Sequence, residues 1–67
     1  MSGLGDAVYI ASLEAEAIKL DEMGDRLQQI ILASPNMGEE FKAKLTQIAT
    51  QRQKDAGEIR MLISARQ

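Results

Sequence analysis

A single proline, Pro35, divides this 67-residue chain into two halves of nearly equal length. It lies in the only interior cluster of turn-forming residues, which begins Ser34-Pro35-Asn36. Because a proline disfavours helical geometry in the residue before it, a helix arriving from the N-terminal side should end by Ala33 or Ser34. The sequence therefore predicts two elements joined by one turn over residues 34–38.

A second helix should begin directly after this turn. Asn36 suits the N-cap position, and Glu39 stands at the spacing from which a carboxylate reaches back to the N–H of the cap. Alternatively, Ser34 caps the helix and Pro35 takes its first position. Either choice predicts the same antiparallel hairpin, with the second helix over about residues 39–65.

The apolar and small residues of the first half follow a heptad pattern, at alternating spacings of three and four. These heptad residues are Ile10, Leu13, Ala17, Leu20, Gly24, Leu27 and Ile31. Asp6 suits the N-cap of a helix over about residues 7–33, which would be about 40 Å long. We therefore expect one all-α domain over residues 1–67, with a polar N-terminal segment at 1–6.

The second half has a less regular apolar pattern. Its apolar residues at heptad spacing are Phe41, Leu45, Ile48, Ile59 and Leu62. The same register places Arg52 and Asp55 on this face. Two interpretations stay open: the charged side chains reach solvent past the apolar ridge, or they form a polar layer that sets the register, with Arg52 paired to a carboxylate such as Glu16 or Asp21.

Two glycines, Gly24 and Gly57, lie inside the predicted helices, where each should cost about 1 kcal/mol relative to alanine. For Gly24, which lies on the heptad face, a close approach of two helices and a merely tolerated penalty are both open. Gly57 lies off that face, and there we favour the tolerated penalty.

The composition excludes most enzyme chemistry. The chain has no His and no Cys, which removes the usual zinc ligands, disulfides, thiol nucleophiles and imidazole bases. Carboxylate pairs such as Glu14 with Glu16 are the only material for acid–base work or hard-metal binding, and they resemble a solvated helix face. We therefore expect no enzyme activity, no catalytic residue, no metal and no cofactor.

The charge distribution argues against nucleic acids and lipid as partners. The net charge of -2 repels phosphate backbones and anionic lipid, and no apolar run approaches the roughly 18 residues of a membrane span. Residues 1–34 carry six acids and two bases, whereas residues 35–67 carry six bases and four acids. Opposite net charges of -4 and +2 favour pairing of the two helices, within one copy or between copies.

A hairpin of this size should need further copies to complete its core. Ordering 67 residues costs on the order of 100 kcal/mol of conformational entropy, and the first helix carries more apolar flanks than one partner helix covers. Tyr9, Met23 and Ile30 lie on one flank, and Ile18 and Leu32 on another. The expected assembly interface consists of Ile10, Leu13, Leu20, Leu27, Ile31, Phe41, Leu45, Ile48, Ile59 and Leu62.

Two short segments carry a family resemblance, within a matching stretch from Leu27 to Ile63. Leu32–Asn36 forms a proline-containing turn, and Phe41–Leu45 forms the apolar start of a second helix. Both resemble the needle subunits of bacterial type III secretion systems and, more loosely, the related inner-rod and flagellar axial proteins. The resemblance implies subunits stacked helically into a hollow filament, with the second helix nearer the channel.

The expected location depends on this resemblance. Residues 1–6 lack the basic start and apolar centre of a secretory signal peptide. If the resemblance holds, the protein is secreted or forms a cell-surface appendage without a cleaved signal peptide; otherwise we expect it in the cytoplasm.

Proteins of other classes would show similar patterns. A small cytosolic helical adaptor or chaperone would cover the amphipathic helix of a partner, or pair two hairpins into a four-helix bundle; an accessory subunit of an enzyme is a third option. We expect Leu27→Asp or Ile31→Asp to abolish assembly, because each puts a charge on the heptad face.

Overall fold

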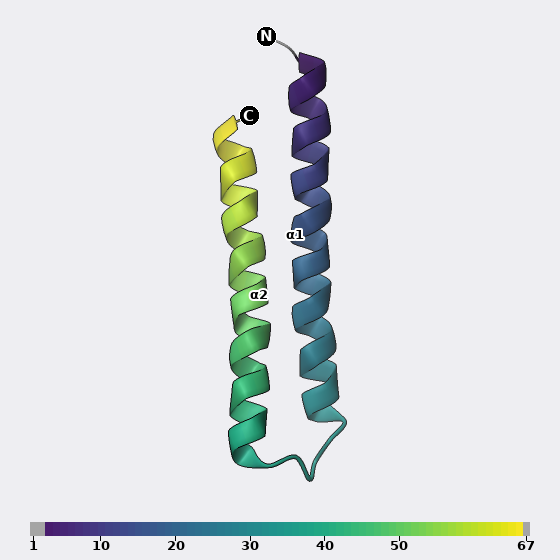
Figure 1. Cartoon of the computed structure of the whole chain (residues 1–67), viewed down its shortest axis with the longest axis vertical. Coiled ribbons are helices and arrows are strands. Elements are labelled where there is room, and N and C mark those ends of the chain that lie inside the picture. The colour runs from purple at the N-terminus through teal and green to yellow at the C-terminus, as the bar shows by residue number, and fades with distance from the viewer. Residues whose placement is uncertain (1–2, 67) are drawn as a thin grey trace.

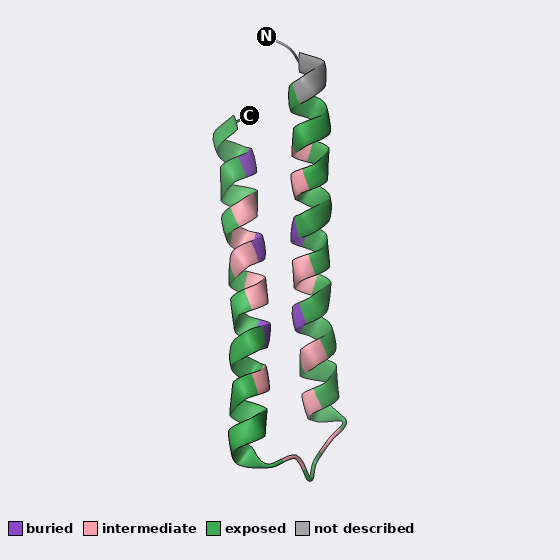
Figure 2. Ribbon diagram, in the orientation of Figure 1, coloured by how far each residue is buried: buried purple, intermediate pink, exposed green. Residues whose placement is uncertain are grey.

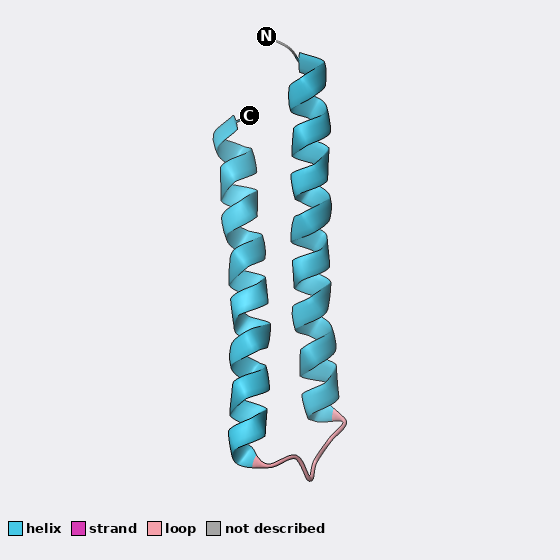
Figure 3. Ribbon diagram, viewed as in Figure 1, coloured by secondary structure: helices cyan, strands magenta, loops and turns pink. Residues whose placement is uncertain are grey.

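Two long helices packed side by side make up the described fold (Figure 1, Figure 3). The computed structural model describes residues 3–66, and side chains from residue 6 onward. Helix α1 spans Gly3–Leu32 and helix α2 spans Glu39–Arg66, and the chain reverses direction between them. Residues 3–66 contain no strand. The predicted all-α antiparallel hairpin is confirmed, as a rod of 55 × 16 × 11 Å.

The ends of α1 differ slightly from the prediction. The helix begins at Gly3, so Asp6 lies inside the first turn and the prediction of Asp6 as the N-cap is wrong. A carboxylate at this position still stabilises the positive end of the helix dipole. The helix ends at Leu32, and the amide of Ala33 donates to the carbonyl of Gln29 at 2.9 Å as the last helical hydrogen bond. The expected polar segment 1–6 is thus helical from residue 3, and residues 1 and 2 lie outside the described part.

The turn between the helices starts at the proline. The amide of Met37 donates to the carbonyl of Ser34 at 3.1 Å and closes a four-residue turn. Pro35 occupies the second position of this turn, where its restricted φ fits without strain. The proline therefore does what its place in the sequence predicts: it ends α1 and reverses the chain.

The N-cap of α2 is Gly38, because its carbonyl accepts the first helical hydrogen bond, from the amide of Lys42 at 2.9 Å. The prediction of Asn36 or Ser34 as the N-cap is wrong, since both residues belong to the preceding turn. The helix nevertheless starts at Glu39, as predicted.

Small side chains line the closest contact between the helices. Ala17, Ala49 and Ala56 are at most 1% exposed, and Gly24 is also buried. A Cβ atom on Gly24 would lie 3.0 Å from the carbonyl oxygen of Ala49, so the two backbones touch here. Because both helices rise equally per residue, this register also sets Ala17 against Ala56, seven residues away on each helix.

The heptad residues of α1 form the face that packs against α2, where Figure 2 places the buried and half-buried positions. All seven are buried or half-buried, and the only other α1 residue from 6 to 32 that is not exposed is Asp21. The heptad pattern thus located the contact inside the hairpin. Its role between copies stays a prediction.

The packing face of α2 is rotated relative to the one we predicted. Its central residues are Leu45, Ala49, Arg52, Ala56, Ile59 and Ile63. Phe41, Ile48 and Leu62 are 62%, 42% and 60% exposed instead. The reason is the close contact between helices: Ala49 and Ala56 admit the backbone of α1, whereas the bulky residues one position earlier would hold it away.

The predicted pairing of Arg52 with Glu16 or Asp21 is wrong. The guanidinium of Arg52 lies 3.5 Å from the carboxylate of Asp55 on the same helix, with 38% of its side chain exposed. Asp21 instead pairs with Arg60 at 2.6 Å. The register of Gly24 with Ala49 sets Arg52 level with Asp21, but Arg52 turns to Asp55 on its own helix. The long side chain of Arg60 reaches Asp21 from about two turns nearer the free ends.

Gly24→Ala and Gly57→Ala form a matched pair that tests the close contact. At Gly24, a Cβ would lie 2.8 Å from Cγ of Gln53 and 3.0 Å from the Ala49 carbonyl, so the helices must separate. We expect Gly24→Ala to destabilise the hairpin by about 1 kcal/mol, because overpacking exceeds the gain in helix propensity. At Gly57 the space within 4 Å is empty, so Gly57→Ala should stabilise by up to about 1 kcal/mol.

Urea unfolding at matched protein concentration measures both free energies. Equal stabilisation by the two alanines would contradict the close contact at Gly24.

Candidate assembly surface

Charged and amide side chains line one lateral side of the hairpin, which we call the polar side. It comprises Glu14, Asp21, Asp25, Gln53 and Arg60. Arg60 donates to Asp21 at 2.6 Å, and Gln53 donates to Asp25 at 3.3 Å. The Arg60 and Asp21 side chains are 49% and 37% exposed, so water screens the pair and it contributes at most about 1 kcal/mol. The polar side therefore adds little to the stability of the hairpin.

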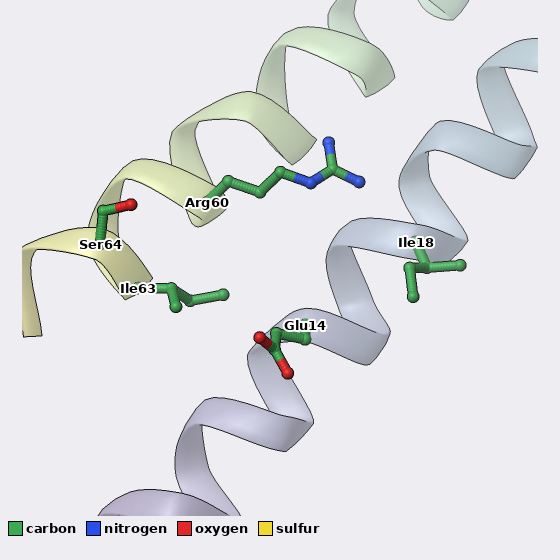
Figure 4. Close-up of a pocket in the computed structure, with 5 residues that line it drawn as sticks. All are labelled: Glu14, Ile18, Arg60, Ile63 and Ser64. Carbon is green, nitrogen blue, oxygen red and sulfur yellow. The ribbon is translucent and has the colours of Figure 1, made fainter. Parts of the chain in front are cut away.

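A shallow hollow near the free ends of the helices interrupts the polar side (Figure 4). Glu14 and Ile18 line it from α1, and Arg60, Ile63 and Ser64 from α2. The lining offers the Ser64 hydroxyl no imidazole or amine that could activate it. Across the described residues, no group of three acidic side chains is arranged to hold a metal ion. The hollow has none of the usual marks of a catalytic site.

Neither described helix combines the length and the apolar character that crossing a membrane requires.

The opposite lateral side carries exposed apolar side chains, which we call the apolar stripe. Its members are Tyr9, Met23, Ile30, Phe41, Ile48 and Leu62, and they are 42–62% exposed. On each helix they recur at multiples of seven residues, so they share a face beside the packing face. In an antiparallel pair these two flanks lie on the same side of the hairpin, away from the ion pair between Asp21 and Arg60.

The apolar stripe is arranged in layers across the two helices. The register that sets Gly24 against Ala49 places each α1 member of the stripe within two residues, about 3 Å along the axis, of one α2 member. The three apolar layers are Ile30 with Phe41, Met23 with Ile48, and Tyr9 with Leu62. The stripe therefore runs from the turn to the free ends of the helices.

The seven-residue spacing of the stripe includes one more position on each helix, and both of these residues are charged. We call this pair the polar layer. It places Glu16 of α1 within the same two-residue offset of Asp55 of α2. The Glu16 carboxylate lies 3.5 Å from the Lys19 amine, and the Asp55 carboxylate lies 3.5 Å from the Arg52 guanidinium. Two acids and two bases thus balance at one point along the stripe.

The residues expected to join copies fall into two groups in the structure. The group on the packing faces inside the hairpin is Ile10, Leu13, Leu20, Leu27, Ile31, Leu45 and Ile59. The other group, Phe41, Ile48 and Leu62, lies on the apolar stripe. Because Leu27 and Ile31 are half-buried between the helices, charges there would disrupt the hairpin itself and would not isolate assembly.

The sequence-based interface left out Tyr9, Met23 and Ile30, although their flank was recognised. The seven-residue spacing in both halves connects them to Phe41, Ile48 and Leu62. The sequence does not show which flanks of the two helices lie on the same side, so the connection becomes visible only in the structure.

Comparison with protein-family models, curated proteins and solved structures finds no match for this chain.

A double-mutant cycle on the polar side tests the register. Asp21→Asn, Arg60→Gln and the double variant should give a coupling energy of about 0.5–1 kcal/mol in low salt. The coupling should fall towards zero near 1 M salt, where the Debye length is about 3 Å. Urea unfolding supplies the four free energies, and a coupling of zero in low salt would contradict the contact between these two residues.

Proposed function

We propose that this chain is a non-enzymatic structural subunit that assembles with copies of itself. The observation that carries the proposal is the apolar stripe: six large side chains lie in layers along one side of the hairpin, and each is 42–62% exposed. Exposed apolar side chains that line one side of a molecule are typical of interaction sites.

The small interior of the hairpin supports the same proposal. Among residues 6–66, the buried apolar side chains are three alanines and Ile63. Leu13, Leu20 and Leu27 are only half-buried, so much of their apolar surface still faces water. Covering the apolar stripe would also cover these leucines, because they lie beside it on α1. Assembly thus supplies the apolar burial that a two-helix unit of this size lacks.

A second exposed apolar group favours an extended assembly. Val8, Ile18 and Leu32 are 62%, 53% and 77% exposed and lie on α1 away from both the packing face and the apolar stripe. A subunit with two separate contact faces can join neighbours in an open helical series, as a filament requires. We therefore propose a helical filament or tube, of the kind the resemblance to secretion needle subunits implies, built outside the cell or at its surface.

The adaptor or chaperone alternative uses the apolar stripe alone. An amphipathic helix of another protein would lie along the stripe, and the product would be a discrete heterodimer. The exposed group Val8, Ile18 and Leu32 has no task in such a complex, and this favours the filament.

Size in solution tests the proposal. We expect sedimentation velocity of the concentrated pure protein to show high-mass material, and electron microscopy to show fibres. Phe41→Gln should weaken assembly, because Phe41 is 62% exposed and makes no buried contact that the fold needs. Circular dichroism confirms that the variant remains helical.

The matched variant carries Ile18→Gln and Leu32→Gln on the outer face of α1. It should still associate through the stripe, but stop at a small discrete species. A wild-type chain that stays monomeric at high concentration would refute self-assembly, whereas a discrete wild-type oligomer would refute the filament alone.

A further inference from the structure

We infer that two copies join stripe to stripe with their turns at the same end, as a four-helix bundle in which the polar layer sets the alignment. This inference rests on the proposed self-assembly and adds the partner, the surface and the orientation. Three observations carry it: the charges of the two helices, the order of the layers, and the extent of the apolar stripe.

The helix charges favour this orientation. Face-to-face copies related by a two-fold axis have two arrangements: an axis along the rod sets α1 over the α2 of the other copy, and an axis across the rod sets α1 over α1. The residues of α1 carry six acids and two bases, and those of α2 carry six bases and four acids. Only the axis along the rod sets helices of opposite net charge, -4 and +2, against each other.

The order of the layers favours the same axis. When both turns lie at the same end, each layer of one copy faces the identical layer of the other copy. The apolar layers then face apolar layers, and the polar layer faces the polar layer. With the copies reversed about the middle of the stripe, the polar layer of Glu16 and Asp55 falls on the apolar layer of Met23 and Ile48. Burying carboxylates against apolar side chains is costly, so the reversed arrangement is disfavoured.

The polar layer is neutral within one copy, and it meets another polar layer only when the two turns lie at the same end. Each copy brings Glu16 with Lys19 and Asp55 with Arg52, both at 3.5 Å. The Arg52 and Asp55 side chains are already 62% and 66% covered within one hairpin, since 38% and 34% remain exposed. Two such layers in contact bring together four acids and four bases, and a buried polar layer of this kind sets alignment at some cost in affinity.

The area of the apolar stripe suffices for a dimer. A large side chain covers roughly 200 Å², so six that are about half exposed present on the order of 600 Å² per copy. Two copies that covered the whole stripe would bury at most about 1,200 Å², which reaches the lower end of the range for specific interfaces. A second hairpin also matches the stripe in length over all of its layers.

Energy transfer between labelled copies tests the orientation. The chain has no cysteine, so Asn36→Cys in the turn and Ser64→Cys near the free end each give one label site, and both positions are exposed. The labels are placed in the chain with Ile18→Gln and Leu32→Gln, which limits contacts outside the stripe. Mixing donor and acceptor at Asn36 should give strong transfer, because the two turns are adjacent. With a dye pair whose Förster distance lies well below about 40 Å, mixing a donor at Asn36 with an acceptor at Ser64 should give weak transfer, because the two positions lie about 40 Å apart.

A variant pair tests the polar layer. Glu16→Leu with Asp55→Leu makes the stripe apolar throughout, so association should tighten at least tenfold and transfer between Asn36 and Ser64 should appear as the orientation becomes mixed. Glu14→Leu with Glu22→Leu makes the same change in charge at two exposed positions of α1 away from the stripe, and should leave both readouts unchanged.

The outcomes separate this inference from the proposed function. Strong transfer from Asn36 to Ser64 in the starting chain overturns the orientation but leaves self-assembly standing. Retention of a single orientation after Glu16→Leu with Asp55→Leu overturns the role of the polar layer. A chain that remains monomeric at every concentration overturns the inference together with the proposed function.

Discussion

The contact of the α1 backbone at Gly24 with the α2 backbone at Ala49 determines the geometry of the whole hairpin. Two antiparallel helices have many possible registers, but only one brings a residue without a side chain against the carbonyl of an alanine and sets a second alanine pair, Ala17 and Ala56, seven residues away. Large side chains would hold the helices further apart. Close packing therefore selects both the register and the rotation of each helix.

This rotation decides what the hairpin presents to its surroundings. Because the alanines take the centre of the α2 face, the bulky residues beside them turn outward, and the flank of α1 on the same side does likewise. The ion pair between Asp21 and Arg60 lies on the other side. Two helices of weakly amphipathic sequence thus form a hairpin with an apolar stripe on one lateral side and charged side chains on the other. The same small residues that limit the interior of the monomer create the surface proposed for assembly.

Sequence reasoning succeeded where information is local. Pro35 predicted the turn, and the unbroken heptad residues of α1 predicted its packing face. It failed where the answer depends on the partner helix: the face of α2 followed Ala49 and Ala56, although Phe41 and Ile48 have the stronger apolar signal. The partner of Arg52 was missed because the direction of the side chains decided it: Arg52 turns to Asp55 on its own helix, and Arg60 reaches Asp21 from further along α2. The N-cap of α2 was missed because the turn uses the residues that looked best suited to it.

The turn lies at one end of the rod, and both helix termini emerge at the other (Figure 1). A bundle of such hairpins aligned turn to turn has two chemically different poles: a compact loop with a proline at one, and open helix ends at the other. Any larger structure stacked from these units would inherit that direction, so its two tips would offer different surfaces to an incoming subunit and would grow at different rates.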